Sequence, residues 1–184
     1  FTDKIASVYG QLKDMVPGYE CVAIPHVKFS ERDWKGLPPE TKQLGCDPDW
    51  NAYTQKLNEI PEGTGEIPER DGAGHVHLGW TEDADINDPV HFEDGVKMVK
   101  QLDWYLGPRT CVWDKDDRRR SGYGKPGAFR IKPYGVEYRY PSNVWINTVE
   151  MQREVFEVCQ KAFKDLLDGT YAPQIFSKSI NDPD

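Results

Sequence analysis

Hydrophobic residues recur at helical spacing in three segments of the chain. The segments are residues 3–15, 92–106 and 151–166, and each is closely followed by Gly or Pro. Residues three and four apart lie on the same side of a helix, so each pattern gives one apolar face. Asn147, with Glu150 three residues later, is typical of the start of the third helix. The pattern therefore predicts three amphipathic helices.

Three shorter segments alternate between apolar and polar residues, over residues 73–80, 127–132 and 135–140. Side chains alternate between two faces along a strand, so each segment predicts a strand with one apolar and one polar face. If the three strands pair, six polar residues share one face of the sheet: His75, His77, Arg130, Lys132, Glu137 and Arg139. With the helices packed on the opposite face, the predicted fold is α+β.

The rest of the chain shows little periodicity. Residues 20–24 predict a short buried strand that Pro25 ends. Residues 31–71 are rich in Pro and Gly and predict a long loop, and residues 173–184 predict a tail. A chain of 184 residues can bury one core but is short for two, so we expect a single domain.

The chain is acidic, with a formal net charge of −8 at pH 7, which argues against a general nucleic-acid binder. The charge is unevenly distributed, because residues 115–139 hold eight Lys or Arg and three Asp or Glu. This local excess predicts an anion site in an otherwise acidic protein. Within it, Arg118, Arg119 and Arg120 are either a solvated run or, through Arg120, a phosphate contact.

No apolar run is long enough to span a membrane, and the first twenty residues lack a signal-peptide pattern. The four cysteines are far apart and form no CxxC pair: Cys21, Cys46, Cys111 and Cys159. We therefore expect a cytoplasmic protein with free, mostly buried thiols and with no membrane partner.

Six glycines lie close to the predicted polar face: Gly72, Gly74 and Gly79 beside the histidines, and Gly122, Gly124 and Gly127 around Lys125. A backbone without side chains lets a phosphate approach closely, so these glycines favour a nucleotide site. The alternative is that the polar face of an antiparallel sheet is simply solvated. The sequence pattern leaves both interpretations open.

The polar residues match the needs of ATP-driven amide synthesis. That chemistry uses a divalent metal, cations around the transferred phosphoryl group and a place for a carboxylate. Glu137 offers a hard oxygen ligand for Mg²⁺ or Mn²⁺, and His75 offers an imidazole. Lys125, Arg130 and Arg139 can neutralise phosphate or carboxylate.

Four stretches of the chain resemble the phage amidoligase type 2 family, which belongs to the glutamine-synthetase-like carboxylate-amine ligases. They are GCDPDWNAYT at 45–54, GAGHVHLGW at 72–80, LDWYLGP at 102–108 and RRRSGYGKPGAFRIKPYGVEYRYPSNVWI at 118–146. The resemblance runs from about Cys21 to Phe163. It implies a mostly antiparallel sheet with an active-site face, and makes residues 1–184 the C-terminal portion of an amidoligase domain.

The resemblance also implies roles for individual residues. His75 and Glu137 would bind the metal, Arg139 the substrate carboxylate or acyl phosphate, and Arg130 the phosphates of ATP. The implied phosphate site takes in Lys125, Lys132 and Arg120 as well. His77, Asp49 and Asn51 are substrate candidates, together with Asp47. For His77 a structural role stays open, and Asp47-Pro48 is also an ordinary turn sequence.

Members of that family begin with two acidic strands that supply metal ligands, and these 184 residues begin with the first helix instead. We therefore expect a further N-terminal segment or a partner chain to complete the metal site. Two ligands make a poor Mg²⁺ site, so weak or no ligase activity is expected from this chain alone. The expected substrates are a small-molecule or peptide carboxylate and an amine. A homo-oligomer or assembly into a virion is compatible with the sequence.

Two other functions remain open on the sequence. A non-catalytic phage structural or interaction protein could reuse the ligase fold. A zinc hydrolase could use the His75 and His77 pair with a third ligand, although zinc binding does not account for the Arg and Lys cluster.

Overall fold

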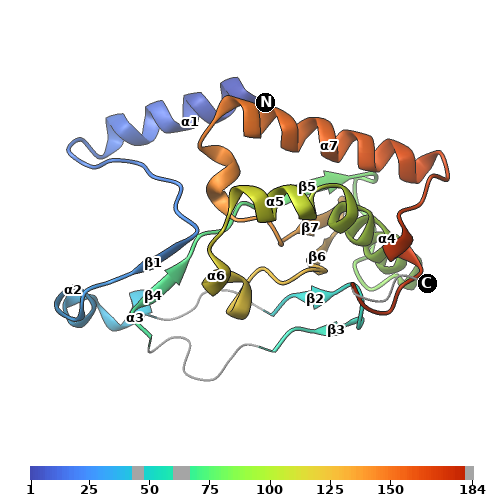
Figure 1. The fold of residues 1–184 in the computed structure, drawn as a ribbon, viewed down its shortest axis with the longest axis horizontal. Helices are drawn as coiled ribbons and strands as arrows, with labels where there is room; N and C mark the ends of the chain where they lie inside the picture. The colour runs from blue at the N-terminus through green and yellow to red at the C-terminus, as the bar shows by residue number, and fades with distance from the viewer. Residues whose placement is uncertain (43–47, 60–66, 181–184) are drawn as a thin grey trace.

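The computed structural model describes residues 1–42, 48–59 and 67–180 (Figure 1). The helices in these ranges are α1 (Thr2–Met15), α2 (Glu31–Gly36), α3 (Pro39–Lys42), α4 (Pro89–Tyr105), α5 (Gly107–Trp113), α6 (Asp117–Gly122) and α7 (Val149–Leu167). The strands are β1 (His26–Lys28), β2 (Trp50–Asn51), β3 (Lys56–Leu57), β4 (Glu69–Asp71), β5 (Val76–Gly79), β6 (Ala128–Lys132) and β7 (Gly135–Tyr138). Short 3₁₀ turns lie at η1 (Asn143–Ile146) and η2 (Pro173–Ile175).

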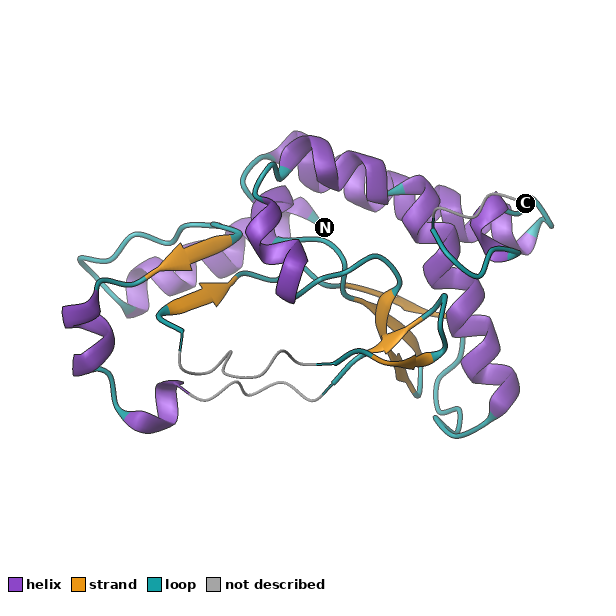
Figure 2. Cartoon of the chain, turned by 60° about the horizontal axis from the view of Figure 1, so that its bottom comes forward, coloured by secondary structure: helices purple, strands orange, loops and turns teal. Residues whose placement is uncertain are grey.

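The three predicted alternating strands pair in one antiparallel sheet with the order β3-β2-β6-β7-β5. In its register Glu137 of β7 lies opposite Arg130 of β6 on one side and His77 of β5 on the other. Figure 2 shows a separate two-stranded ribbon of β1 and β4, on the other side of the molecule from this sheet.

The apolar face of the sheet packs against α4, and α7 packs on α4 in turn (Figure 1). The core forms where Phe129, Val136 and Tyr138 of the sheet meet Val99 and Leu102 of α4. Asp88 and Pro89 start α4 in the usual way, since the Asp88 side chain accepts a hydrogen bond from the backbone of the first turn. Helices packed on one face of an antiparallel sheet confirm the predicted α+β class.

A buried carboxyl group lies inside this helix–sheet interface. The hydroxyl of Tyr138 donates a hydrogen bond of 2.7 Å to Asp103 of α4. Burial raises the pKa of Asp103 to about 6, although the bond from Tyr138 acts in the opposite direction. Tyr138, which follows Glu137 in β7, is therefore hydrogen-bonded to the helix layer.

The C-terminal residues also contact α4. Lys100 is buried and donates to the backbone carbonyls of Ser177, at 2.7 Å, and Ile175, at 3.3 Å. Burial lowers the pKa of Lys100. The first part of the expected tail therefore packs against the helix layer.

The predicted strand at residues 20–24 is wrong. These residues have no regular structure, and Val22 and Ile24 are exposed. The strand that does form is β1, which begins just after Pro25 and pairs with β4. A short apolar run cannot reveal whether a partner strand exists, and that partner decides where pairing occurs.

Three smaller expectations also change. Thr148, and not Asn147, caps α7 by accepting a hydrogen bond from the backbone of Met151, while Asn147 donates to the carbonyl of Ala23. Of the described cysteines, Cys21 and Cys111 are exposed and only Cys159 is buried, so the thiols are not mostly buried. Cys46 lies outside the described residues. The segment 31–71 contains the short elements α2, α3, β2, β3 and β4.

The helix expected at residues 3–15 forms as α1, but none of its residues is buried. Among the helices that the structure describes, none is long and apolar enough to cross a membrane.

The buried carboxyl group predicts a pH-dependent stability. The pKa of Asp103 lies above its ordinary value of 3.8, so its contribution to stability is complete below that value and is lost as the pH rises through about 6. Asp103→Asn cannot ionise and keeps an acceptor for Tyr138. Between pH 4 and pH 7.5, the free energy of unfolding of this variant should rise by about 2 kcal/mol relative to that of the native chain.

Urea unfolding at several pH values measures this difference. Asp94→Asn removes a half-exposed carboxylate from the same helix and serves as the control. A constant difference between the Asp103→Asn variant and the native chain across the pH range would contradict the predicted titration.

Candidate functional site

Glu137 is the centre of the polar face. It is 5% exposed, and both of its carboxylate oxygens have partners. Oε1 lies 2.9 Å from Nδ1 of His75 and accepts a hydrogen bond from Arg139, while Oε2 lies 3.0 Å from Nζ of Lys132. Burial raises the pKa of Glu137, but the hydrogen bond from Lys132 and the charge of Arg139 outweigh it and hold that pKa at about 2. The group is a carboxylate at neutral pH.

Arg139 is 1% exposed, and its three shortest hydrogen bonds go to different partners, while its Nη1 also lies 3.5 Å from Nδ1 of His75. It donates to Glu137, to Oδ2 of Asp49 at 3.0 Å through Nε, and to the hydroxyl of Tyr123 at 2.8 Å through Nη2. Asp49 is held in turn by the side-chain amide of Asn58 at 2.8 Å. A buried guanidinium is stable only when it is paired and hydrogen-bonded, and two carboxylates meet that requirement here.

His75 closes the arrangement. Burial, together with the charge of Arg139, lowers the pKa of His75 to about 4, so the ring is neutral at pH 7 and carries one N–H. Nδ1 faces the carboxylate of Glu137 and must donate to it, which leaves Nε2 to accept from the hydroxyl of Tyr123 at 2.7 Å. The bonds form a ring that runs from Arg139 to Tyr123, His75 and Glu137, with Arg139 also bonded to Glu137.

Tyr123 is the site residue that the sequence did not identify. Two guanidinium groups lie near its ring, that of Arg119 at 5.2 Å and that of Arg139 at 5.4 Å. Tyr123 lies in the segment between α6 and β6, outside any strand, so strand alternation gives no signal for it. Its position in the YGK string, inside the basic segment, is the only sequence feature that marks it.

The other predicted site residues lie outside this hydrogen-bonded ring. Lys132 contacts Glu137, and Arg130 shares the polar face opposite Glu137 in the register. Exposed His77 contacts the hydroxyl of Tyr134 at 2.5 Å through Nδ1. Lys125 lies in the turn before β6, where its carbonyl accepts from the backbone of Ala128.

Two predicted residues have their side chains engaged elsewhere. Arg120 pairs with Asp117 at 2.6 Å and with Asp114 at 3.5 Å. The side-chain oxygen of Asn51 accepts from the backbone of Tyr53 and Thr54, which closes the turn after β2. Asp47 lies outside the described residues.

The glycines were predicted to leave the backbone open to a phosphate. This prediction is wrong for most of them, because protein atoms fill the space that a side chain would occupy. A Cβ on Gly74 would lie 2.2 Å from the carbonyl oxygen of Ser142, and one on Gly124 would lie 2.5 Å from the guanidinium of Arg119. Gly72 and Gly127 are similarly crowded, whereas Gly122 faces open space. Close packing therefore requires glycine at positions 72, 74, 124 and 127.

Arg119 explains part of this crowding. It is 1% exposed and donates to three backbone carbonyls, those of Gly72, Tyr140 and Pro141, at 2.8 to 3.0 Å. Burial lowers its pKa. Arg119 thus joins α6 to the segments before β5 and after β7, and holds Tyr123 against the polar face.

The residues present make only part of a metal site. His75 and Glu137 are adjacent, but the described ranges contain no group of three or more His, Cys, Asp or Glu side chains that could hold a metal ion. Both oxygens of Glu137 are already bonded to cationic side chains. The donors present do not complete a Mg²⁺ site, and the zinc arrangement considered for His75 and His77 lacks a third donor there.

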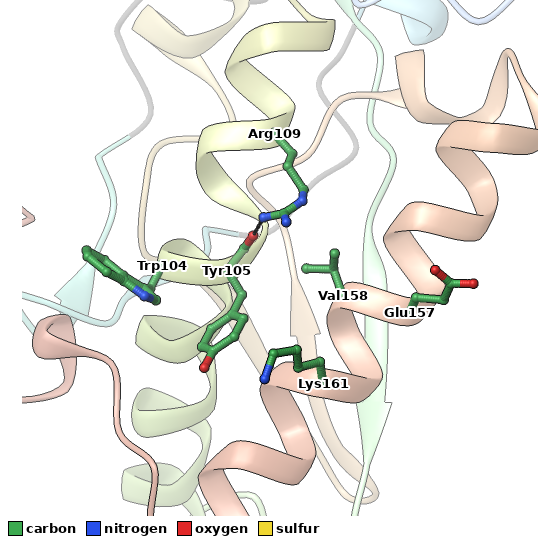
Figure 3. Close-up of a pocket in the computed structure, with 6 residues that line it drawn as sticks. All are labelled: Trp104, Tyr105, Arg109, Glu157, Val158 and Lys161. Atoms are coloured by element: carbon green, nitrogen blue, oxygen red, sulfur yellow. Dashed lines mark hydrogen bonds between the residues drawn. The ribbon is translucent and has the colours of Figure 1, made fainter.

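A separate groove of about 450 Å³ lies on the helix layer, between α4, the start of α5 and α7 (Figure 3). Its two cations already have partners, since Arg109 pairs with Glu154 at 2.8 Å and Lys161 pairs with Asp165 at 2.6 Å. The cations of the groove are therefore compensated, as those of the polar face are, but they are more exposed to solvent than Arg139.

Comparison with known families found a match. The family model of the phage phiEco32-like COOH.NH2 ligase-type 2 matches residues 72–167, which is more than half of the chain. The matched range contains His75, Arg130, Lys132, Glu137 and Arg139, and it begins after Asp49. Comparisons with curated proteins and with solved structures found no match.

The hydrogen-bonded ring predicts a specific cost for removing one hydroxyl. Tyr123→Phe leaves a buried donor of Arg139 and Nε2 of His75 without their partner, so the free energy of unfolding should fall by about 1–3 kcal/mol. Tyr134→Phe removes the hydroxyl that contacts exposed His77 and should change stability by no more than about 0.5 kcal/mol. Urea unfolding of both variants measures the contrast, and equal effects would argue against the ring.

Proposed function

Because the chain belongs to the family of the phage phiEco32-like COOH.NH2 ligase-type 2, we propose that it joins a carboxylate to an amine at the expense of ATP, through an acyl phosphate. The observation that carries the proposal is the convergence of His75, Lys132, Glu137 and Arg139 on one face of the sheet. The finer likeness to the glutamine synthetase sheet, and a place in the cytoplasm, are parts of the same proposal.

The proposed reaction has two steps. In the first, an oxygen of the substrate carboxylate attacks the γ-phosphorus of ATP, which forms an acyl phosphate and releases ADP. In the second, the nitrogen of the amine attacks the acyl carbon, phosphate leaves with the bonding electrons, and the amine loses a proton. Negative charge develops on phosphate oxygens in both steps, so fixed cations lower the barriers.

The chain's own residues fit parts of this chemistry. Arg139 is held in one orientation by Asp49 and Glu137, which would preorganise it for a carboxylate or acyl phosphate. Arg130 and Lys132 lie on the same strand at alternate positions and face the same side, where they would hold phosphates together with Lys125. His77 is exposed beside them and could contact the amine substrate.

Two assignments made from sequence carry less weight in this proposal. The guanidinium of Arg120 is bonded to aspartates, and the amide of Asn51 closes its own turn. Asp49 acts through Arg139 and would position it.

A divalent metal supplies electrophilic assistance to phosphoryl transfer when it is bound. The described residues offer His75 and Glu137, and this pair is insufficient alone. We propose that the remaining ligands come from ATP, water and a further segment or partner chain. The substrates are proposed as a small-molecule or peptide carboxylate and an amine, and self-association or assembly into a virion stays part of the proposal.

One observation favours a second candidate function, a non-catalytic interaction protein that retains the ligase fold. The charges of Glu137, Arg139 and Asp49 neutralise one another inside the sheet face, which is what a purely structural network requires. Such a protein would bind no nucleotide at millimolar ATP, and the following experiment separates the two.

The first prediction concerns ATP binding, measured by calorimetric titration in the presence of Mg²⁺. Arg130→Gln removes a charge-assisted contact to phosphate, so the dissociation constant should rise about tenfold or more. Arg109→Gln alters the exposed arginine of the helix-layer groove and should leave ATP binding unchanged. Absence of any ATP binding by the native chain would contradict the enzyme proposal and would support the second candidate, a non-catalytic interaction protein.

The second prediction concerns turnover, measured as ADP release that depends on both a carboxylate and an amine. Glu137→Gln removes the charge that holds His75, Lys132 and Arg139 together, so turnover should fall at least a hundredfold while the circular dichroism spectrum is preserved. The assay should include any chain that completes the site. Unchanged turnover would remove Glu137 from the mechanism.

A further inference from the structure

The polar face of the sheet continues from β6 onto the β2–β3 hairpin. Trp50 of β2 packs against Phe92 of α4, so the residue before it, Asp49, points to the opposite, polar face. Trp50 pairs with Leu57, and the next residue, Asn58, donates a backbone hydrogen bond of 2.7 Å to the carbonyl of Asp49. Asn58 therefore lies opposite Asp49 on the polar face.

The side-chain amide of Asn58 is held from both ends. Its Nδ2 donates to Oδ1 of Asp49 at 2.8 Å, and its Oδ1 accepts a longer bond of 3.5 Å from Nδ2 of Asn51. Nδ2 of Asn51 also donates to the carbonyl of Pro126 at 3.3 Å. A carboxylate can only accept hydrogen bonds, so the donor end of the Asn58 amide must face Asp49.

Asp49 passes this restraint to Arg139. Its second oxygen, Oδ2, accepts a hydrogen bond of 3.0 Å from Nε of Arg139. The terminal torsion of an Asp side chain has a broad energy minimum, so a carboxylate bonded through one oxygen can still turn. Bonds to both oxygens fix it. The amide of Asn58 therefore restrains the carboxylate that orients the Arg139 guanidinium.

The hairpin does not need this side-chain bond for its own pairing, because the backbone bond from Asn58 to Asp49 already closes that end. Two of the three shortest bonds of Arg139, to Glu137 and Tyr123, stay within the matched residues 72–167. The bond to Asp49 comes from outside that range. The hairpin thus adds a restraint on Arg139 that the matched segment does not contain.

We propose that Asn58 is a positioning residue of the polar face. It fixes the carboxylate of Asp49, which holds the guanidinium of Arg139 in the orientation that receives an acyl phosphate. This inference rests on the proposed function, because the acyl phosphate is the intermediate proposed there. Without the Asn58 amide, Asp49 can turn, and Arg139 loses the partner that fixes its Nε.

The test uses acetyl phosphate as the probe, titrated into the full chain while the Nε–H proton of Arg139 is followed by NMR. A saturable shift of this signal is expected from the native chain. Asn58→Ala removes a hydrogen bond to a charged group, so the dissociation constant for acetyl phosphate should rise about tenfold or more. Exchange of the Arg139 Nε–H with water should also become about tenfold faster.

A matched control removes a comparable hydrogen bond elsewhere. Asn147 is part-buried and donates its side-chain amide to the carbonyl of Ala23 at 3.1 Å. Asn147→Ala should leave the affinity for acetyl phosphate and the exchange of the Arg139 Nε–H unchanged. The contrast between the two variants separates positioning from a general loss of stability.

Asn58→Asp adds a readout that a purely structural residue would not give. The new carboxyl group faces Asp49, so the two share a proton at low pH and repel each other once both are ionised. The protonated carboxyl group donates in place of the amide. Affinity for acetyl phosphate, relative to the native chain at the same pH, should therefore be closer to native at about pH 5 than at about pH 8.

Two results would overturn the inference and leave the proposed function standing. They are equal affinities of the native chain and Asn58→Ala for acetyl phosphate, and an unchanged exchange rate of the Arg139 Nε–H in that variant. A native chain that binds no acetyl phosphate would overturn both. If Asn58→Ala fails to fold, Asn58→Asp decides the question, since the same relative affinity at both pH values contradicts the inference.

Discussion

The polar face depends on one interaction, the buried pair of Glu137 and Arg139. A buried guanidinium costs several kcal/mol unless carboxylates and hydrogen-bond acceptors surround it. The chain meets this requirement with Asp49 on a second element and Tyr123 on a third. Lys132 and Arg139 lower the pKa of Glu137, and burial together with the charge of Arg139 lowers the pKa of His75, so Glu137 is a carboxylate and His75 is neutral at pH 7.

The pair also explains why one arrangement is compatible with both catalysis and a structural role. The ring of bonds through Tyr123 and His75 orients Arg139 without any ligand, which is the preorganisation that an oxyanion site needs. It also satisfies its own charges, which a purely structural network needs. A ligand must therefore offer the cations better partners than the carboxylates they already contact.

Strand alternation was sufficient to predict the three central strands, their shared polar face and the helices behind them, because both periods are local properties of the sequence. Alternation could not find Tyr123 or the Asp49 contact with Arg139, which depend on segments that meet only in three dimensions. A short apolar run misplaced a strand at residues 20–24, because pairing there depends on β4, and the interpretation of the glycines failed because Ser142 and Arg119 pack against Gly74 and Gly124. Long-range packing decided each of these cases.

Tyr138, the last residue of β7, lies between Glu137 and Arg139 in the sequence, and its hydroxyl is bonded to Asp103 of α4. The strand thus contacts the helix layer on one face and carries the hydrogen-bonded ring on the other. Contacts on both faces of β7 resist rotation of the strand about its axis and hold the side chains of Glu137 and Arg139 together. Discrimination at this face would then come from rigidity, with poorly shaped molecules rejected because the strand does not yield.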